Sequence, residues 1–286
     1  MIVDCHVNVY EDRHVLPLLK DETKFFRPGA PPLKADPDTV FRGMAGVDKA
    51  IVFSLRYADS SGIDGDDEVT AATVAKYPDK FVGFAALDPR HEDAMALLEH
   101  AIHDLHLKGV KFGPIYNGVS LLDARMEKFY LFCIRNNLPL TLHMGTTYAR
   151  NAPLEFGRPI YVDEVALRYP ELKIVMAHMG HPWYEECIAV ARKQPNVYCE
   201  VSALHYRPWQ YYNILICAQE YTIHDRNKIF FGTDFPYAGV EESIAGLRGI
   251  NHLVAGTHLP RVAEVTMEGI IHSNPFAHWW HGGLAV

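Results

Sequence analysis

The sequence predicts a single-domain α/β protein with the architecture of a (β/α)8 barrel, the TIM-barrel fold. Three observations support this prediction. The length of 286 residues is typical of one such barrel. Eight short runs rich in Val, Ile and Phe recur along the chain, and stretches with helical periodicity separate them. Alternating strands and helices predict parallel pairing through right-handed crossovers, so an open doubly wound sheet is the competing architecture.

The predicted elements follow one another without a linker, a repeat or a low-complexity tract, so residues 1–286 are expected to form one domain. The eight predicted strands are residues 2–8, 49–55, 80–87, 109–115, 139–145, 173–180, 196–203 and 228–235. Helical periodicity is clearest at residues 91–109, 123–137, 160–170 and 183–195. The longest irregular stretch, at about 10–37, follows the first strand, and we expect it to form a flap over the C-terminal face of the barrel.

Composition narrows the class of protein. The net charge is −8, and the sequence has no run of basic residues that could bind along a phosphate backbone, so we expect no nucleic acid partner. No apolar stretch approaches the roughly 18 residues that would span a membrane. The five cysteines are scattered without CxxC spacing, which is typical of reduced thiols, and no export signal is visible. We therefore expect a cytoplasmic protein, and the sequence leaves homo-oligomerisation open.

Polar side chains stand at the C-terminal ends of several predicted strands, where a barrel collects its chemistry. Imidazole nitrogens and a carboxylate are ligands of divalent transition metals, and three or more of them from separate strands leave a position open for substrate. One such histidine is more often a buried, hydrogen-bonded residue, but several at matching depth favour a mononuclear metal site. In chain order the residues are Asp4, His6 and Asn8, then His143, then His178 followed by His181, and finally Asp234.

The motifs that contain these residues resemble the amidohydrolase superfamily. They are a DxHxH-like motif in the first strand, a histidine ending the fifth, AHMG at 177–180, GTDFP at 232–236 and a closing helix similar to GxNA. More narrowly, the pattern resembles the amidohydrolase-related group that includes aminocarboxymuconate semialdehyde decarboxylase and the resorcylate-type decarboxylases. The resemblance covers nearly the whole chain.

The resemblance implies one divalent metal, with zinc the first expectation and manganese the second. It makes His6, His143 and His178 ligands, and Asp234 both a ligand and the catalytic acid or base. Asn8 is included in the ligand set because it stands where many members have a second histidine. An amide oxygen is a poorer zinc ligand than an imidazole, so this departure puts metal affinity and identity in question.

Three further residues near the strand ends are expected to assist the site. His181 could orient a substrate or shuttle a proton, whereas a structural role beside Pro182 is equally compatible with the sequence. Asp4 and Glu200, in the first and seventh strands, are expected to support the metal ligands through hydrogen bonds. Lys111, in the fourth strand, is not expected to bridge two metals, because a GxK segment is common in single-metal members of the group.

The loops after the strands carry candidate substrate-binding residues. An arginine at the rim could bind a carboxylate through two hydrogen bonds, and tyrosine rings could form walls around an aromatic or unsaturated substrate. The residues expected in this role, for a small-molecule substrate, are Arg56, Tyr116, His205, Arg207 and Tyr237.

Two reactions are compatible with these residues. In a hydrolase, Asp234 would accept a proton from a metal-activated water that attacks a lactone, ester or amide. In a non-oxidative decarboxylase, the same carboxyl would protonate a ring or alkene carbon. The sequence slightly favours hydrolysis, because the chain is compact and the decarboxylases of this group tend to have larger insertions. A third alternative, a metal-free binding protein or a silent relative, follows from the loss of the second histidine.

Overall fold

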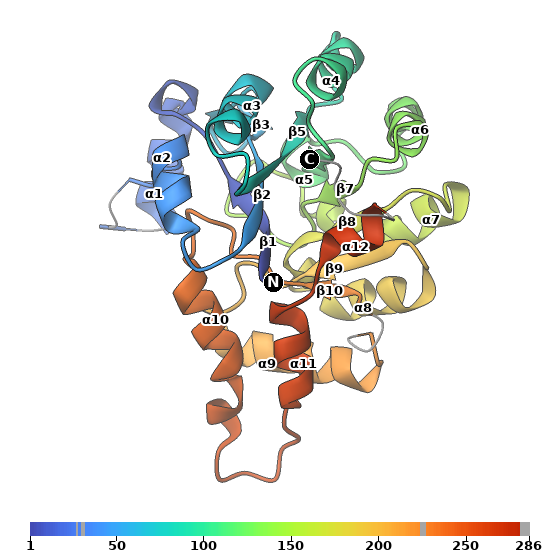
Figure 1. Ribbon diagram of the computed structural model, residues 1–286. Helices are drawn as coiled ribbons and strands as arrows, with labels where there is room; N and C mark the ends of the chain where they lie inside the picture. The colour runs from blue at the N-terminus through green and yellow to red at the C-terminus, as the bar shows by residue number, and fades with distance from the viewer. Residues whose placement is uncertain (27, 30–31, 224–226, 281–286) are drawn as a thin grey trace.

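The computed structural model describes residues 1–26, 28–29, 32–223 and 227–280. Over these residues the chain forms an eight-stranded sheet in the order β1, β2, β5, β6, β7, β8, β9, β10, and every neighbouring pair is parallel (Figure 1). The strands are β1 (Val3–Asn8), β2 (Lys49–Phe53), β5 (Phe81–Leu87), β6 (Val110–Phe112), β7 (Leu140–Leu142), β8 (Ile174–Met176), β9 (Val197–Glu200) and β10 (Ile229–Phe230).

The sheet closes on itself between its last and first strands. The backbone N–H of Asp234 donates to the carbonyl of His6 at 2.9 Å, and that of Asn8 donates to the carbonyl of Phe235 at 2.9 Å. A parallel bridge joins Val7 to Phe235. The predicted (β/α)8 barrel is therefore confirmed. Because the closure runs through the two segments that carry His6 and Asp234, it also brings those side chains together.

Helices surround the barrel (Figure 1). Acidic residues cap two of them, because the carboxylate of Asp36 accepts from the N–H of Thr39 and that of Asp66 from the N–H of Val69. The helices are α1 (Pro17–Phe26), α2 (Pro37–Gly43), α3 (Asp67–Lys76), α4 (Ala94–His103), α5 (Pro114–Asn117), α6 (Glu127–Arg135), α7 (Ile160–Arg168), α8 (Tyr184–Lys193), α9 (Pro208–Glu220), α10 (Val240–Arg248), α11 (Glu264–Ile271) and α12 (Pro275–Trp279).

Several predicted elements have different bounds in the structure; the sixth barrel strand, for example, ends at Met176 and the eighth at Phe230. The fourth strand ends at Phe112 rather than at residue 115, because Pro114 takes the first position of helix α5, where its fixed φ suits a helix and its missing N–H costs nothing. The stretch at about 10–37 is not irregular throughout. It contains α1, which also begins with a proline, Pro17. Residues 27, 30 and 31 of this stretch lie outside the described part of the chain.

The barrel core is apolar and its thiols are free. Four of the cysteines, Cys5, Cys133, Cys187 and Cys199, are buried, and none of the five forms a disulfide within the described residues. In the described chain no helix combines the length and apolarity that crossing a bilayer requires.

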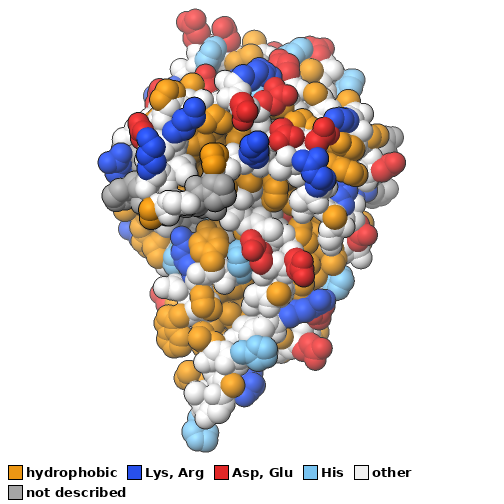
Figure 2. Space-filling model, turned by 90° about the vertical axis from the view of Figure 1, so that its left-hand side faces the viewer, with side chains coloured by type: hydrophobic (Ala, Val, Ile, Leu, Met, Phe, Trp, Pro, Cys, Tyr) orange, Lys and Arg blue, Asp and Glu red, His pale blue; other side chains and the backbone are white. Residues whose placement is uncertain are grey.

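The segment from α10 to α11 extends away from the barrel (Figure 1). Figure 2 shows hydrophobic side chains on the lower part of the molecule.

Candidate active site

A cavity of about 790 Å³ opens among the loops that follow the barrel strands. Titratable side chains from several different strands or their ends reach into it, and tyrosine rings form its walls. A single cavity therefore collects residues from distant parts of the sequence, as the fold requires. The predicted site residues that line it are His6, Asn8, Tyr116, His143, His178, His181, His205, Arg207, Asp234 and Tyr237. Three predicted residues, Asp4, Arg56 and Glu200, do not line it.

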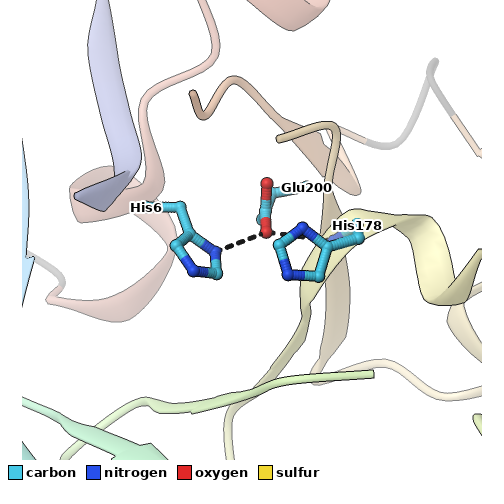
Figure 3. A group of neighbouring side chains, drawn as sticks. All are labelled: His6, His178 and Glu200. Atoms are coloured by element: carbon cyan, nitrogen blue, oxygen red, sulfur yellow. Dashed lines mark hydrogen bonds and ion pairs between the residues drawn. The ribbon is translucent and has the colours of Figure 1, made fainter. Parts of the chain in front are cut away.

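Glu200 connects the histidines of the first and sixth barrel strands (Figure 3). Its Oε1 accepts from Nδ1 of His6 at 2.9 Å and from the backbone N–H of His178 at 3.1 Å. Its Oε2 accepts from the backbone N–H of Ser202 at 2.6 Å. Glu200 is fully buried, so these bonds replace the water that the carboxylate would otherwise need. The carboxylate fixes the position of both histidines.

The opposite nitrogen of the His6 ring faces the cavity. Nε2 lies 3.2 Å from Nζ of Lys111 and 3.4 Å from Oδ1 of Asp234. Burial, followed by the charges of Lys111 and His143, holds the pKa of His6 well below its usual value. The ring is therefore neutral. Because its Nδ1–H donates to Glu200, its Nε2 has a lone pair that accepts a hydrogen bond from Lys111.

His143 and His178 face each other. Nε2 of His143 lies 3.0 Å from the carbonyl of Thr146, so it carries the proton and Nδ1 keeps the lone pair. This Nδ1 is 3.1 Å from Nε2 of His178. Burial lowers the pKa of His143 to about 3 and holds that of His178 well below its usual value, so both rings are neutral. His178 has φ +57°, a left-handed conformation that is uncommon outside glycine.

Ser202 decides which nitrogen of His178 carries the proton. Its backbone carbonyl, 3.2 Å from Nδ1 of His178, can only accept a hydrogen bond, so Nδ1 carries the proton. Its Oγ lies 2.8 Å from the same Nδ1 and donates to Oε1 of Glu200 at 2.9 Å. The lone pairs of Nε2 of His178 and Nδ1 of His143 therefore face each other across 3.1 Å. A cation between them would remove that repulsion.

The donor set therefore fits a divalent transition metal. Among the described residues, His6, His178 and Glu200 bring possible ligand atoms within 4.8 Å of one another. Glu200 already accepts hydrogen bonds from both histidines and from Ser202, so we assign it to orienting the rings. Four atoms remain to hold an ion. They are Nε2 of His6, Nδ1 of His143, Nε2 of His178 and Oδ1 of Asp234.

Asp234 lies at the floor of the cavity in a strained segment, with φ +68°. Its Oδ1 accepts from the side-chain amide of Asn8 at 2.9 Å, and the same amide donates to the carbonyl of Phe235 at 2.8 Å. Burial raises the pKa of Asp234 to about 7, although Asn8 and Lys111 act in the opposite direction. The carboxyl is therefore partly protonated near neutral pH. Asn8, predicted as a ligand, uses its amide nitrogen to orient this carboxyl.

Two of the predicted residues that do not line the cavity, Asp4 and Arg56, form hydrogen bonds within the barrel. Asp4 accepts from the hydroxyl of Thr233 at 2.7 Å and from the backbone N–H of His6 at 3.0 Å, and therefore connects the first and last barrel strands. Arg56 donates from Nη2 to the carboxylate of the buried Asp67 at 3.0 Å. The residue begins a small hairpin, β3 (Arg56–Tyr57) with β4 (Ile63–Asp64), and its side chain binds helix α3 rather than reaching the cavity.

Aromatic side chains form the cavity walls. The rings of Tyr57 and Tyr116 stack with centroids 4.6 Å apart, and the hydroxyls of Tyr148 and Tyr237 are 3.1 Å apart. Phe26, the last residue of α1, stacks on Tyr148 at 4.1 Å and lines the cavity. The predicted flap thus contributes a ring to the site.

Some residues of the site were not assigned to it from the sequence. Ser202 follows Glu200 by two positions within the strand predicted at 196–203, so the alternation of side chains could have indicated it. Tyr148 lies in the loop after β7 and had no comparable signal. The contact between Lys111 and His6 joins two strands that are not neighbours, which only the closed barrel reveals.

A model of the amidohydrolase family matches residues 3–275. No curated protein matches the chain. Among solved structures, an uncharacterised TIM-barrel protein from Bordetella bronchiseptica is 22% identical, with a TM-score of 0.71 and 96% of each chain covered.

Two similar structures are decarboxylases. The 5-carboxyvanillate decarboxylase of Sphingomonas paucimobilis is 15% identical, with a TM-score of 0.62, covering 97% of this chain and 98% of that one. A dihydroxybenzoic acid decarboxylase from a Polaromonas species, with bound manganese and the inhibitor 2-nitroresorcinol, is 18% identical, with a TM-score of 0.64 and 94% of each chain covered. At these identities the likeness concerns the fold.

Proposed function

The chain belongs to the amidohydrolase family, and from that premise we propose that it is a non-oxidative decarboxylase of a small aromatic or unsaturated carboxylic acid. The observation that carries the proposal is the position of Asp234, which lines a cavity with aromatic walls. In the absence of a bound ion, burial raises the pKa of this carboxyl to about 7. A carboxyl that keeps its proton near neutral pH can give it to carbon. The decarboxylases with the same fold support this choice.

The reaction needs one proton delivered to one carbon. The substrate ring lies between the tyrosine walls, and Asp234 donates its proton to the carbon that bears the carboxylate. The bond to the carboxyl carbon then breaks, its electron pair returns to the ring, and carbon dioxide leaves. Water reprotonates Asp234. Asn8 keeps the carboxyl in place throughout, because its amide holds both Asp234 and the carbonyl of Phe235.

A divalent metal belongs to the proposal. The residues that would hold it are His6, His143, His178 and Asp234, with Glu200 orienting the first and third. When bound, the ion would hold substrate oxygen atoms and stabilise negative charge on them. We propose zinc or manganese, and a similar structure contains manganese.

Two of the residues that line the cavity are suited to an acidic group of the substrate. Arg207 and His181 both line it, and the guanidinium of Arg207 is positioned by a hydrogen bond of 2.9 Å from Nη1 to the carbonyl of Ala203. Burial, followed by the charge of Arg207, lowers the pKa of His181. Nδ1 of His181 is buried and has no hydrogen-bond partner among the described residues. A carboxylate or phenolate oxygen would satisfy both groups.

We propose that α1 acts as part of the flap and limits access of water to the cavity. Phe26 stacks on Tyr148 and so closes one side of the aromatic wall. Exclusion of water favours proton transfer from Asp234 to carbon over proton loss to solvent.

The experiment is an activity panel on protein of known metal content. Elemental analysis of the purified protein comes first. Carboxylated phenols are then assayed for carbon dioxide release, and lactones, esters and amides for acid release. The proposal predicts carbon dioxide from at least one carboxylated phenol. Acid release from a lactone without any decarboxylation would instead support the hydrolase that the sequence slightly favoured, and a protein inactive in both assays would support a binding role.

A further inference from the structure

We propose that the amino group of Lys111 competes with a divalent ion for the cavity-facing nitrogen of His6, so that this side chain sets how tightly the site binds metal. The inference rests on the metal site proposed above and goes beyond it, because it concerns a residue that would not itself be a ligand. It predicts a change in metal affinity that can be measured without any substrate.

The first step is the hydrogen bond between the two residues. Lys111 lies on β6 and is 2% exposed, and its Nζ is 3.2 Å from Nε2 of His6. The other ring nitrogen of His6 donates to Glu200 at 2.9 Å. Nε2 therefore has one lone pair, and Lys111 donates a hydrogen bond to it. A lone pair that accepts an N–H bond is not available to a metal, so one partner must leave before the other binds.

The second step is that the Phe53 ring holds Lys111 beside the proposed ion site. Its Nζ lies 4.7 Å from the centre of the Phe53 ring, close enough for a cation–π contact. Oδ1 of Asp234 is 3.4 Å from the same His6 nitrogen. An ion bound between His6 and Asp234 would therefore lie beside the amino group, and repulsion between cations is strong in a buried site.

The third step is the weakness of the remaining ligand set. Asn8 occupies the position of a second imidazole, and its amide nitrogen is used by Asp234 and Phe235. With fewer strong ligands available, a bound ion depends on the lone pair of His6. A purely structural lysine, which fills the cavity floor and touches no ion, would leave that affinity unchanged.

The test is the affinity of metal-free protein for Mn²⁺ and Zn²⁺, measured by isothermal titration calorimetry after chelator treatment. Lys111→Met removes the amino group and keeps a flexible chain of similar length. The matched control is Lys108→Met, which removes the same charge at an exposed residue just before β6. We expect the dissociation constant of Lys111→Met to fall by about ten-fold or more and that of the control to stay close to wild type. Any smaller fall in Lys111→Met, or weaker binding, would overturn the proposal.

A second measurement does not depend on the variant folding. A crystal structure of the wild-type protein soaked in Mn²⁺ should show Nζ of Lys111 displaced from His6 wherever an ion is bound to that ring. An ion bound to Nε2 of His6 while Nζ of Lys111 remains within hydrogen-bond distance of that same nitrogen would refute the inference. Neither measurement uses a substrate, so both remain informative if the protein proves not to be a decarboxylase.

Discussion

The imidazole of His6 and the carboxylate of Glu200 lie 194 residues apart in sequence and 2.9 Å apart in the structure. This bond fixes which nitrogen of His6 faces the cavity, and the same carboxylate oxygen also binds the backbone of His178. The arrangement of the site therefore depends on Glu200, a residue that does not line the cavity.

Glu200→Gln should reduce both metal affinity and turnover. The amide has one acceptor oxygen in place of two, so it cannot accept from His6 and from the backbone N–H of Ser202 at once. Its neutral oxygen is also a weaker acceptor than a carboxylate for Nδ1–H of His6, so the ring is held less firmly. We expect a loss of about 10–100-fold in metal affinity, measured by calorimetry. An affinity equal to that of wild type would show that Glu200 does not orient the ligands.

Asp234→Asn should lower the decarboxylation rate by about 10²–10⁴-fold, because the amide has no proton of suitable acidity to donate. The fold should persist, since the residue sits at the open end of the barrel. Asp4→Asn is the contrasting variant. It weakens the contact with Thr233 and His6, so thermal unfolding should occur at a lower temperature while the chemistry is retained in the folded fraction. Comparable activity in Asp234→Asn and wild type would exclude Asp234 as the acid.

The pH dependence of the rate should follow the protonation of Asp234. Burial raises the pKa of this carboxyl to about 7, and the proton-donating form is the protonated one. The rate at saturating substrate should therefore be highest below that pKa and fall as pH rises through about 7. A rate that instead rises over this range would indicate a carboxylate acting as a base, as hydrolysis requires.

The two arginines offered by the sequence should behave differently. Arg207→Met should raise KM by about ten-fold or more with little effect on stability, because Arg207 lines the cavity and its loss removes a charged hydrogen bond to the substrate. Arg56→Met should leave KM unchanged and destabilise the protein, because it leaves the buried carboxylate of Asp67 without its partner. Thermal unfolding and steady-state kinetics on both variants check the pair. The reverse pattern would contradict the placement of these side chains.

Much of the fold and part of the site could be predicted from sequence because both depend on local patterns. His143 and His178 each end an apolar strand, and the ends of parallel strands meet at one face of a barrel. Arg56 also follows a strand, but the hairpin after it directs the side chain towards Asp67, which no local pattern reveals. The pairing of Lys111 with His6 depends on closure of the barrel, and so do the distances that decide their chemistry.

The most direct test of the proposed chemistry is decarboxylation of a carboxylated phenol in heavy water. If Asp234 delivers the proton, each molecule of carbon dioxide released should be matched by one deuterium at the carbon that lost the carboxylate, and Asp234→Asn should slow both by about 10²–10⁴-fold. Turnover of a lactone or amide to an acid, with no carbon dioxide released from any member of the panel, would contradict the account.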